Sequence, residues 1–297
     1  MARVAVIGLG AMGGGMARSC LAAGLETLGV DTDAARVAAF QADGGAQGAP
    51  PQAAADLDIV VVVVVNAAQA EAALFGPSGV APALRKGAVI VCCVTMAPEQ
   101  ARALSARAEA LGLFFLDAPI SGGAAKAARG ALSILASGPE AGFAAAKPAL
   151  DAMAETVFRL GEDPGAGSAM KAINQMLVGV HIAAAAEALT FGMTQGVAPE
   201  KTLEVISKCA GASWALENRG PHIAAGDYTP LSAVDIWPKD LGIVLDIARG
   251  AKFSAPMTAA ALQQFVAASG SGLGREDDAA IAKVYARNAG LTLPGDR

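Results

Sequence analysis

The sequence predicts an α/β protein: a doubly wound parallel sheet in the first half, followed by an all-α part. In the first half, short apolar runs alternate with helix-like segments, which is the pattern of strands joined by crossover helices. Residues 59–65 are one Ile and six Val. Such a β-branched run, apolar on both faces, favours a strand that helices cover on both sides of the sheet. After residue 163 the pattern contains helices without further strands.

The expected elements of the first half follow one another in order. The predicted strands are 4–7, 27–30, 59–65, 88–93, 114–116 and 133–136, and the predicted helices are 11–23, 34–41 and 99–111. Gly24 ends the first of these helices, and Lys86 and Gly87 precede the fourth strand. This order is typical of a Rossmann-type doubly wound sheet.

The second half begins with a change of pattern. A Pro-Gly-Ala-Gly stretch at 164–167 marks a boundary near residue 163, so we expect domains at residues 1–163 and 164–297. From Ser168 to about Gln195 no proline interrupts the helical pattern. A helix of this length spans roughly 40 Å at about 1.5 Å per residue, enough to link two domains. Further helices are expected at 200–209, 213–218, 239–251, 257–269 and 277–289.

Composition excludes several classes of protein. Of the 297 residues, 54% are hydrophobic and 16% are charged, which is too apolar and too weakly charged for a disordered chain. The net charge is −5, from 22 Lys and Arg against 27 Asp and Glu, and without a basic stripe no nucleic-acid partner is expected. The mean hydropathy of +0.46 reflects abundant Ala and 35 Gly rather than a membrane span. Apolar runs such as 59–65 fall far short of the roughly 20 residues that a span needs.

The number and spacing of the cysteines indicate in which cellular compartment the protein is expected. They are Cys20, Cys92, Cys93 and Cys209; none forms a C-x-x-C pair, and two His are few for a zinc site. The first residues lack the pattern of a signal peptide. We therefore expect a cytoplasmic protein with reduced thiols and no bound metal, in which Cys92 and Cys93 are buried in a strand.

A G-x-G-x-x-G motif lies between the first strand and the first helix. Gly8 permits the tight turn, Gly10 lets the backbone approach a pyrophosphate, and Gly13 lets the helix pack close to the strand. A helix N-terminus at this point favours an anion. The alternative is a glycine-rich turn without a ligand, but the strand, the helix and a following acidic residue are all present. The expected cofactor contacts are Gly8, Leu9, Gly10, Ala11, Met12 and Gly13.

Asp31 selects the form of the dinucleotide. It closes the second strand, 23 residues after Gly8, where a carboxylate accepts hydrogen bonds from a ribose diol and repels a 2′-phosphate. Asp33 adds a second negative charge nearby, and we interpret Arg36 as a solvated helix residue. The sequence therefore favours NAD over NADP.

Two further stretches carry candidate chemistry. Residues 117–123 read Asp-Ala-Pro-Ile-Ser-Gly-Gly after a strand, and Ser121 with the amides of Gly122 and Gly123 could hold a carboxylate; a plain tight turn is an equal alternative. Lys171 and Asn174 are three residues apart on one face of the long helix. Oxidation of an alcohol needs a base, and desolvation can lower the pKa of a lysine enough for it to act as that base. A lysine in the first turn of a helix is, however, more commonly a solvated charge.

Four motifs in this order resemble the β-hydroxyacid dehydrogenase family, which includes 3-hydroxyisobutyrate dehydrogenase and tartronate semialdehyde reductase. They are residues 8–13, residues 117–123, residues 167–171 with Asn174, and Lys239-Asp240-Leu241. The resemblance covers nearly the whole chain. It implies an NAD-binding Rossmann domain at 1–163, and at 164–297 an interdomain helix with an all-α domain for substrate binding and oligomerisation.

The resemblance also implies roles for single residues. It implies that Lys171 is the catalytic acid/base and that Asn174 anchors the substrate. Ser121, Gly122 and Gly123 would hold the substrate carboxylate, and Lys239 would close over the nicotinamide end of the cofactor. The family further implies a homodimer or homotetramer.

Within the family, residues 174–182, 213–219 and 235–240 resemble L-threonate dehydrogenase and its aldonate-oxidising relatives. Many members have Asn-Asn where this chain has Asn174-Gln175, and many have Ser-Thr where this chain reads Cys93-Val94-Thr95, in which Thr95 is expected to keep the cofactor contact. A longer hydroxylated acid needs more polar partners. The candidates, each with a packing alternative, are Ser213, Trp214, Asn218 and His181. For His181 we favour a core or subunit contact.

The sequence thus predicts NAD-dependent oxidation of a small anionic hydroxy acid, with a four-carbon aldonate such as L-threonate favoured. Alternatives within the family are 3-hydroxyisobutyrate dehydrogenase and tartronate semialdehyde reductase. An imine reductase shares the expected architecture, but Lys171 argues against it. A non-enzymatic dinucleotide-binding protein is a further alternative, against which Lys171 and Asn174 both argue.

Overall fold

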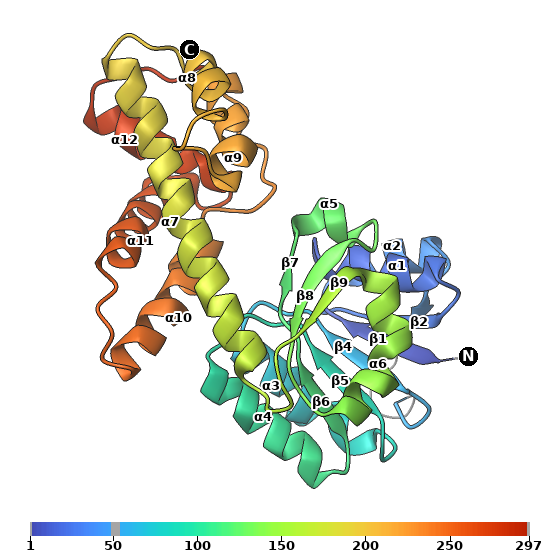
Figure 1. Cartoon of the computed structure of the whole chain (residues 1–297). Helices are drawn as coiled ribbons and strands as arrows, with labels where there is room; N and C mark the ends of the chain where they lie inside the picture. Colours follow the sequence, from blue (N-terminus) through green and yellow to red (C-terminus); the bar gives the residue numbers. More distant parts are fainter. Residues whose placement is uncertain (1, 49–53, 296–297) are drawn as a thin grey trace. The chain divides into compact units, whose positions relative to one another are not determined.

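The computed structural model describes residues 2–48 and 54–295 (Figure 1). The chain divides into two compact units, Met1–Lys171 and Ala172–Arg297. This division lies within the long helix, beyond the boundary expected near residue 163. The boundary itself stays a prediction.

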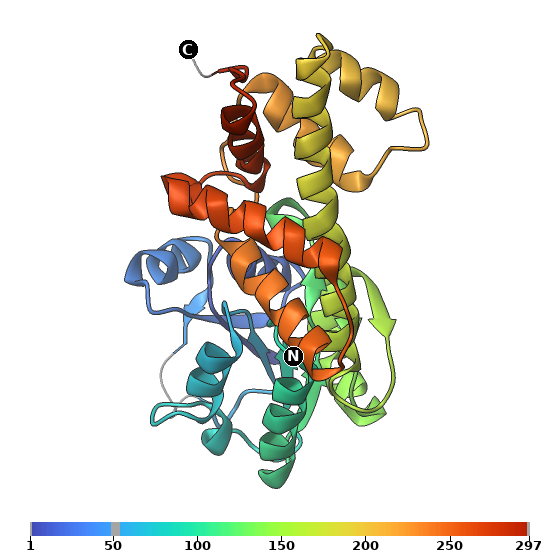
Figure 2. The ribbon, with the colours of Figure 1, turned by 90° about the vertical axis from the view of Figure 1, so that its left-hand side faces the viewer.

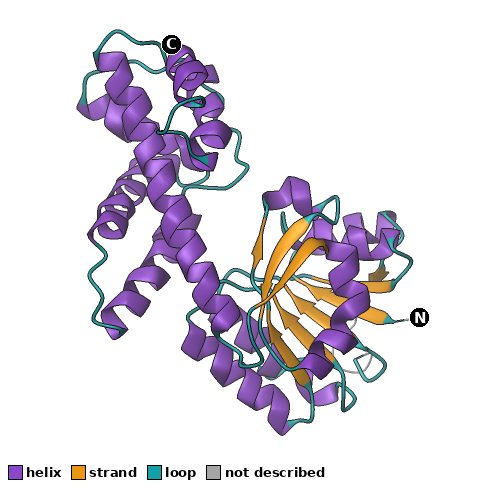
Figure 3. Cartoon of the chain, viewed as in Figure 1, coloured by secondary structure: helices purple, strands orange, loops and turns teal. Residues whose placement is uncertain are grey.

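A parallel six-stranded sheet forms the centre of the first unit, with strand order β3-β2-β1-β4-β5-β6. Figure 3 shows its strands lying side by side. The strands are β1 (Arg3–Ile7), β2 (Glu26–Val30), β3 (Ala46–Gln47), β4 (Ile59–Val62), β5 (Val89–Cys92) and β6 (Phe114–Asp117). The order reverses between β1 and β4, and the crevice at the carboxyl ends of strands at such a switch point is where doubly wound sheets bind ligands.

Helices cover both faces of this sheet, as the valine run predicts. The helices are α1 (Gly13–Ala22), α2 (Ala34–Ala42), α3 (Ala67–Phe75), α4 (Pro98–Ala110) and α6 (Glu140–Met153). One core cluster joins Val61 to α1, α2 and α6, and the other joins Val60 and Val62 to α3 and α4. Cys92 and Cys93 are buried in these clusters, as expected. The predicted fold class is confirmed.

A second, smaller sheet corrects one expectation. The run at 133–136, expected in the doubly wound sheet, belongs to β8 (Leu132–Ala136), which pairs with β7 (Ile120–Ser121) and β9 (Ala154–Arg159) in a separate three-stranded sheet. The short helix α5 (Gly123–Ala127) lies between β7 and β8 in the chain. Another parallel strand needs a crossover of a dozen or more residues. Only residues 118 and 119 separate β6 from β7, too few for such a crossover, and β8 then pairs with β7 in the antiparallel direction.

The described part of the second unit is helical, as expected. Its elements are the long helix α7 (Ala166–Thr194), which starts in the first unit, α8 (Pro199–Ile206), α9 (Trp214–Ala225), α10 (Ile236–Gly250), α11 (Pro256–Ala268), the turns η3 (Ser269–Leu273) and η4 (Asp278–Ile281), and α12 (Ala282–Asn288). α10 and α11 lie side by side, as Figures 1 and 2 show. Trp237 of α10 stacks on Phe265 of α11, with ring centroids 5.4 Å apart.

Two helices of this unit differ from simple sequence rules. By length and composition alone, α7 could cross a membrane. In this structure Ile182, Ala186 and Leu189 of α7 are buried in the core of the helical unit. α9 continues to Ala225 although the sequence predicts an end near 218, because Pro221 is accommodated inside the helix.

Candidate active site

The glycine turn at the end of β1 admits only glycine at two positions. Gly8 has φ +95°, and a Cβ on it would lie 2.2 Å from the carbonyl oxygen of Val63. A Cβ on Gly13 would lie 1.8 Å from the carbonyl oxygen of Gly8. The turn and the start of α1 therefore pack backbone against backbone, as the motif predicts for a close strand-to-helix connection.

The start of α1 suits an anionic ligand. Its N-cap residue, Met12, makes no side-chain cap hydrogen bond. The Gly14 N–H donates to the Gly10 carbonyl oxygen at 2.9 Å, and the other amides of a helix N-terminus can bind an anion. A Cβ on Gly10 would meet only the Arg36 guanidinium, at 3.6 Å. Leu9 is buried, Ala11 is exposed and Met12 is half-buried. This cradle fits the pyrophosphate of a dinucleotide, and the residues that would hold it are those of the turn.

Asp31 connects the end of β2 to the glycine turn. Its Oδ2 accepts a hydrogen bond from the backbone N–H of Leu9 at 2.6 Å, and its Oδ1 accepts one from Asp33 at 2.8 Å. Arg36 is an exposed residue of α2, as expected, and it also lies 3.5 Å from the same carboxylate and 3.3 Å from Asp33. Burial by itself raises the pKa of Asp31, but the two N–H donors and the guanidinium together hold it below its ordinary value.

The remaining predicted cofactor residue of the first unit lies at the same edge of the sheet. Thr95 follows β5 and is half-buried. Because all strands of the sheet are parallel, the residues after β1, β2 and β5 share its carboxyl edge. The structure therefore places Thr95, Asp31 and the glycine turn along one edge.

Lys171 lies beside the serine-glycine loop. Lys171 is only 8% exposed. Its Nζ donates a hydrogen bond of 2.8 Å to the carbonyl oxygen of Ile120, the residue before Ser121. Gly122 and Gly123 have φ of +135° and +75°, and a Cβ on Gly123 would meet nothing within 4 Å. The structure thus brings the buried amine of Lys171 beside the loop that carries Ser121, Gly122 and Gly123.

The residues that anchor the start of α7 were not predictable from the sequence. Asp117, at the end of β6, is 1% exposed, and it accepts hydrogen bonds from the backbone N–H groups of Gly165 and Ser168 and from the Ser168 hydroxyl, at 2.7 to 2.9 Å. Ser137 accepts another from Gly167. Burial raises the pKa of Asp117, while these donors oppose the increase. Asp117 therefore caps the helix that carries Lys171 one turn later, and an acidic residue closing an apolar strand was its only signal in the sequence.

In the second unit, two predicted residues belong to one polar chain. Asn174 donates from Nδ2 to Gln175 Oε1 at 2.9 Å, and Gln175 donates from Nε2 to the carboxylate of Asp240. Lys239 Nζ lies 2.7 Å from Asp240 Oδ1. From the sequence alone, Gln175 is only a departure from the family pattern, and Asp240 is only part of the motif at residues 239–241.

Other candidates of the second unit make local contacts. Ser213 caps α9 by accepting from the backbone N–H of Leu216 at 3.1 Å. Trp214 is 59% exposed, and the Arg219 guanidinium lies 5.6 Å from its ring centroid. His181 is exposed, so a core position for it is wrong. Roles for Ser213 and Trp214 in substrate binding stay predictions.

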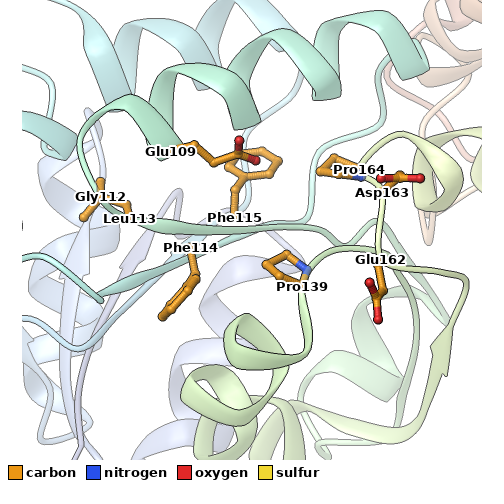
Figure 4. Close-up of a pocket in the computed structure, with 9 residues that line it drawn as sticks. All are labelled: Glu109, Gly112, Leu113, Phe114, Phe115, Pro139, Glu162, Asp163 and Pro164. Atoms are coloured by element: carbon orange, nitrogen blue, oxygen red, sulfur yellow. The ribbon is translucent and has the colours of Figure 1, made fainter.

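One hollow of the first unit lies away from these residues. It has a volume of about 420 Å³ and is lined by Phe114, Pro139, Glu162 and Asp163 among others (Figure 4). Phe114 begins β6, so this hollow lies at the amino end of that strand, opposite the carboxyl edge. Its acidic side chains are unsuited to an anionic ligand. It is not the candidate site.

A parallel Rossmann sheet, a glycine turn with an acidic partner and a buried lysine define an NAD-dependent dehydrogenase, and the comparisons with known proteins agree. Residues 3–161 match the NAD-binding domain of 6-phosphogluconate dehydrogenase. Residues 165–285 match the NAD-binding domain of NADP-dependent 3-hydroxyisobutyrate dehydrogenase. The chain belongs to this family of 3-hydroxyisobutyrate dehydrogenase-like hydroxyacid dehydrogenases.

Individual relatives match this chain over nearly its full length. The chain is 49% identical to L-threonate dehydrogenase of Cupriavidus necator, with 98% of each chain covered. It is 44% identical to L-threonate dehydrogenase of Haemophilus influenzae, covering 98% of this chain and 96% of the relative. The crystal structure of 3-hydroxyisobutyrate dehydrogenase from Salmonella typhimurium is similar, with a TM-score of 0.89, 45% identity, and coverage of 96% of this chain and 100% of that one.

Proposed function

We propose that the chain oxidises a four-carbon aldonate, L-threonate in the first place, with NAD as the hydride acceptor. The observation that carries the chemistry is the buried amine of Lys171 beside the loop of Ser121 and Gly122. Two L-threonate dehydrogenases, at 49% and 44% identity over nearly the full length, support the substrate. Asp31 supports NAD over NADP because its carboxylate would repel a 2′-phosphate.

The chain's own residues bind the acid and move one proton. Ser121 and the amides of Gly122 and Gly123 hold the substrate carboxylate. Lys171, in its neutral form, accepts the hydroxyl proton while the C–H bond electrons leave with the hydrogen as hydride and the C=O bond forms. NAD, when bound, would supply the acceptor for this hydride. The proton on Lys171 then passes to water, so the products are the oxo acid, NADH and a proton.

Residues of the second unit are also proposed to bind the substrate and the cofactor. Asn174 lies one turn after Lys171 on α7 and would bind the acid, and Lys239 would contact the cofactor. Ser213 and Trp214 remain candidates for the far end of a longer acid. We also propose a cytoplasmic homodimer or homotetramer, which size-exclusion chromatography with light scattering would test.

A second candidate function is oxidation of 3-hydroxyisobutyrate. It is favoured by the similarity to the Salmonella typhimurium structure of 3-hydroxyisobutyrate dehydrogenase. That acid has one hydroxyl and a methyl branch, whereas L-threonate has three hydroxyls and no methyl group. The polar pair Asn174 and Gln175 favours the more hydroxylated acid.

The test is NADH formation at 340 nm and alkaline pH with a panel of acids. The panel contains L-threonate, D-threonate, erythronate, 3-hydroxyisobutyrate and glycerate, each with NAD and with NADP, and tartronate semialdehyde with NADH in the reverse direction. We expect the highest kcat/KM for L-threonate with NAD. A preference for 3-hydroxyisobutyrate or glycerate would overturn the substrate, and activity confined to imines or absent altogether would overturn the reaction.

A further inference from the structure

A buried carboxylate on α10 fixes the orientation of a side-chain amide on α7. Asp240 is 3% exposed, its Oδ1 lies 2.7 Å from Lys239 Nζ, and its Oδ2 accepts from Gln175 Nε2. An ionised carboxylate accepts hydrogen bonds and donates none. Gln175 must therefore turn its amino group toward Asp240 and its oxygen away from it.

Gln175 passes this orientation to its neighbour. The Oε1 atom of Gln175 accepts a hydrogen bond from Asn174 Nδ2 at 2.9 Å. Because Gln175 is only 7% exposed, water could hardly replace either of its partners. Amide nitrogen and oxygen point in different directions, so the commitment of Nδ2 to Gln175 turns Oδ1 of the half-buried Asn174 to the other side. We call Lys239, Asp240, Gln175 and Asn174 the amide relay.

We propose that Asp240 and Gln175 are positioning residues that make Asn174 an acceptor for a hydroxyl hydrogen of the substrate. The inference rests on the proposed function and adds the chemical group that is recognised. An acceptor oxygen binds an O–H donor, repels a carboxylate, and is left unpaired beside a methyl group. Sites built to hydrogen-bond a hydroxyl reject the analogue that lacks it for this reason. The amide relay thus selects polyhydroxylated acids over 3-hydroxyisobutyrate.

The first variant is Asp240→Asn, which keeps the side-chain shape but removes the charge and adds a donor, so Gln175 is free to turn over. The readout is the ratio of kcat/KM for L-threonate to kcat/KM for 3-hydroxyisobutyrate at saturating NAD. One neutral hydrogen bond contributes enough for a fall in this ratio of about three- to tenfold. The fall should come from a higher KM for L-threonate, with kcat changed less.

A second variant, Gln175→Asn, is shorter by one methylene and cannot bridge Asn174 and Asp240. We expect it to lower the ratio in the same direction. The matched control is Glu276→Gln, which breaks a 2.7 Å ion pair with Lys283 in the same unit and should leave the ratio unchanged. Because Asp240 also contacts Lys239, NADH binding is measured by fluorescence for each variant.

The NMR chemical shifts of the Asn174 and Gln175 side-chain NH2 groups give a readout that does not depend on turnover. We expect both to shift in Asp240→Asn and neither to shift in Glu276→Gln. An unchanged ratio, unmoved amide signals, or an equal loss of rate with both acids that follows weaker NADH binding would each overturn the amide relay while leaving the proposed function intact. If the wild type oxidised no acid, the proposed function would fail, and the amide signals alone would decide whether the relay exists.

Discussion

The carboxylate of Asp31 accepts a hydrogen bond of 2.6 Å from the backbone N–H of Leu9, which fastens the end of β2 to the glycine turn. A second hydrogen bond, from Asp33, and the ion pair with Arg36 use further positions on the same carboxylate. A carboxylate has about four lone-pair sites, so room remains for a ribose hydroxyl. Asp31 thus shapes the turn, and we predict that it also binds the ribose of the cofactor.

Asp31→Asn is expected to weaken NAD binding and to relax the preference against NADP. The amide loses the charge that attracts ribose hydroxyls and that would repel a 2′-phosphate, and Arg36 loses an ionic partner. Hydrogen bonds to a charged group contribute about 1.5–3 kcal/mol, so KM for NAD should rise by about tenfold or more. The matched control is Asp58→Asn, since Asp58 also accepts a backbone N–H and pairs with an arginine, but at the opposite edge of the sheet. An unchanged ratio of NAD to NADP activity in Asp31→Asn would contradict this role.

The pH dependence of stability should report the lowered pKa of Asp31. Its pKa in the folded state lies below the ordinary value of about 3.9. The unfolded chain therefore binds this proton more tightly, and the stabilisation is complete above the unfolded value and lost as pH falls through the folded pKa. The difference in unfolding free energy between the wild type and Asp31→Asn should be constant from pH 7 to about 5 and shrink below about pH 4. Urea denaturation across this range tests it, and a difference that grows toward acid pH would refute it.

Gly167→Ala is expected to loosen the start of α7. A Cβ there would lie 2.4 Å from the carbonyl oxygen of Asp117 and 2.5 Å from that of Leu135, and neither backbone atom can yield easily. We expect a loss of about 1–3 kcal/mol in unfolding free energy, together with lower kcat because Lys171 lies one turn later. The control is Gly242→Ala in α10, where a Cβ meets nothing within 4 Å and alanine should be neutral or stabilising by about 0.5–1 kcal/mol. Equal stability of the two variants would contradict the close approach.

How far the sequence predicts the fold depends on how local each signal is. The buried strands β4 and β5 are short valine-rich runs, and the long helix lacks proline, so both were predictable. Helix α6 was not, because Pro148 lies inside it and would ordinarily end a helix. The strand β9 has no regular alternation of buried and exposed residues, so no period of two marked it.

Some residues of the candidate site were likewise predictable from local sequence patterns, and others were not. The glycine turn and Asp31 follow a spacing rule within one β-α-β unit. The bond between Asp117 and Ser168 joins residues 51 positions apart, and the one between Gln175 and Asp240 joins residues 65 apart. Only tertiary structure creates these pairs, so the anchoring of α7 and the amide relay were invisible in the sequence. The roles of the individual site residues stay predictions.

Single-turnover NADH formation by Lys171→Met with L-threonate at saturating NAD tests most directly whether Lys171 takes the hydroxyl proton. The substitution keeps an unbranched side chain of similar length but removes the base, and the control is Lys147→Met, which removes an exposed lysine paired with Asp151. We expect the rate to fall by about 10²- to 10⁴-fold, as for the loss of a general base, while the Kd for NADH stays within about twofold of the wild-type value. A Lys171→Met enzyme that forms NADH at the wild-type rate would show that another group accepts the proton.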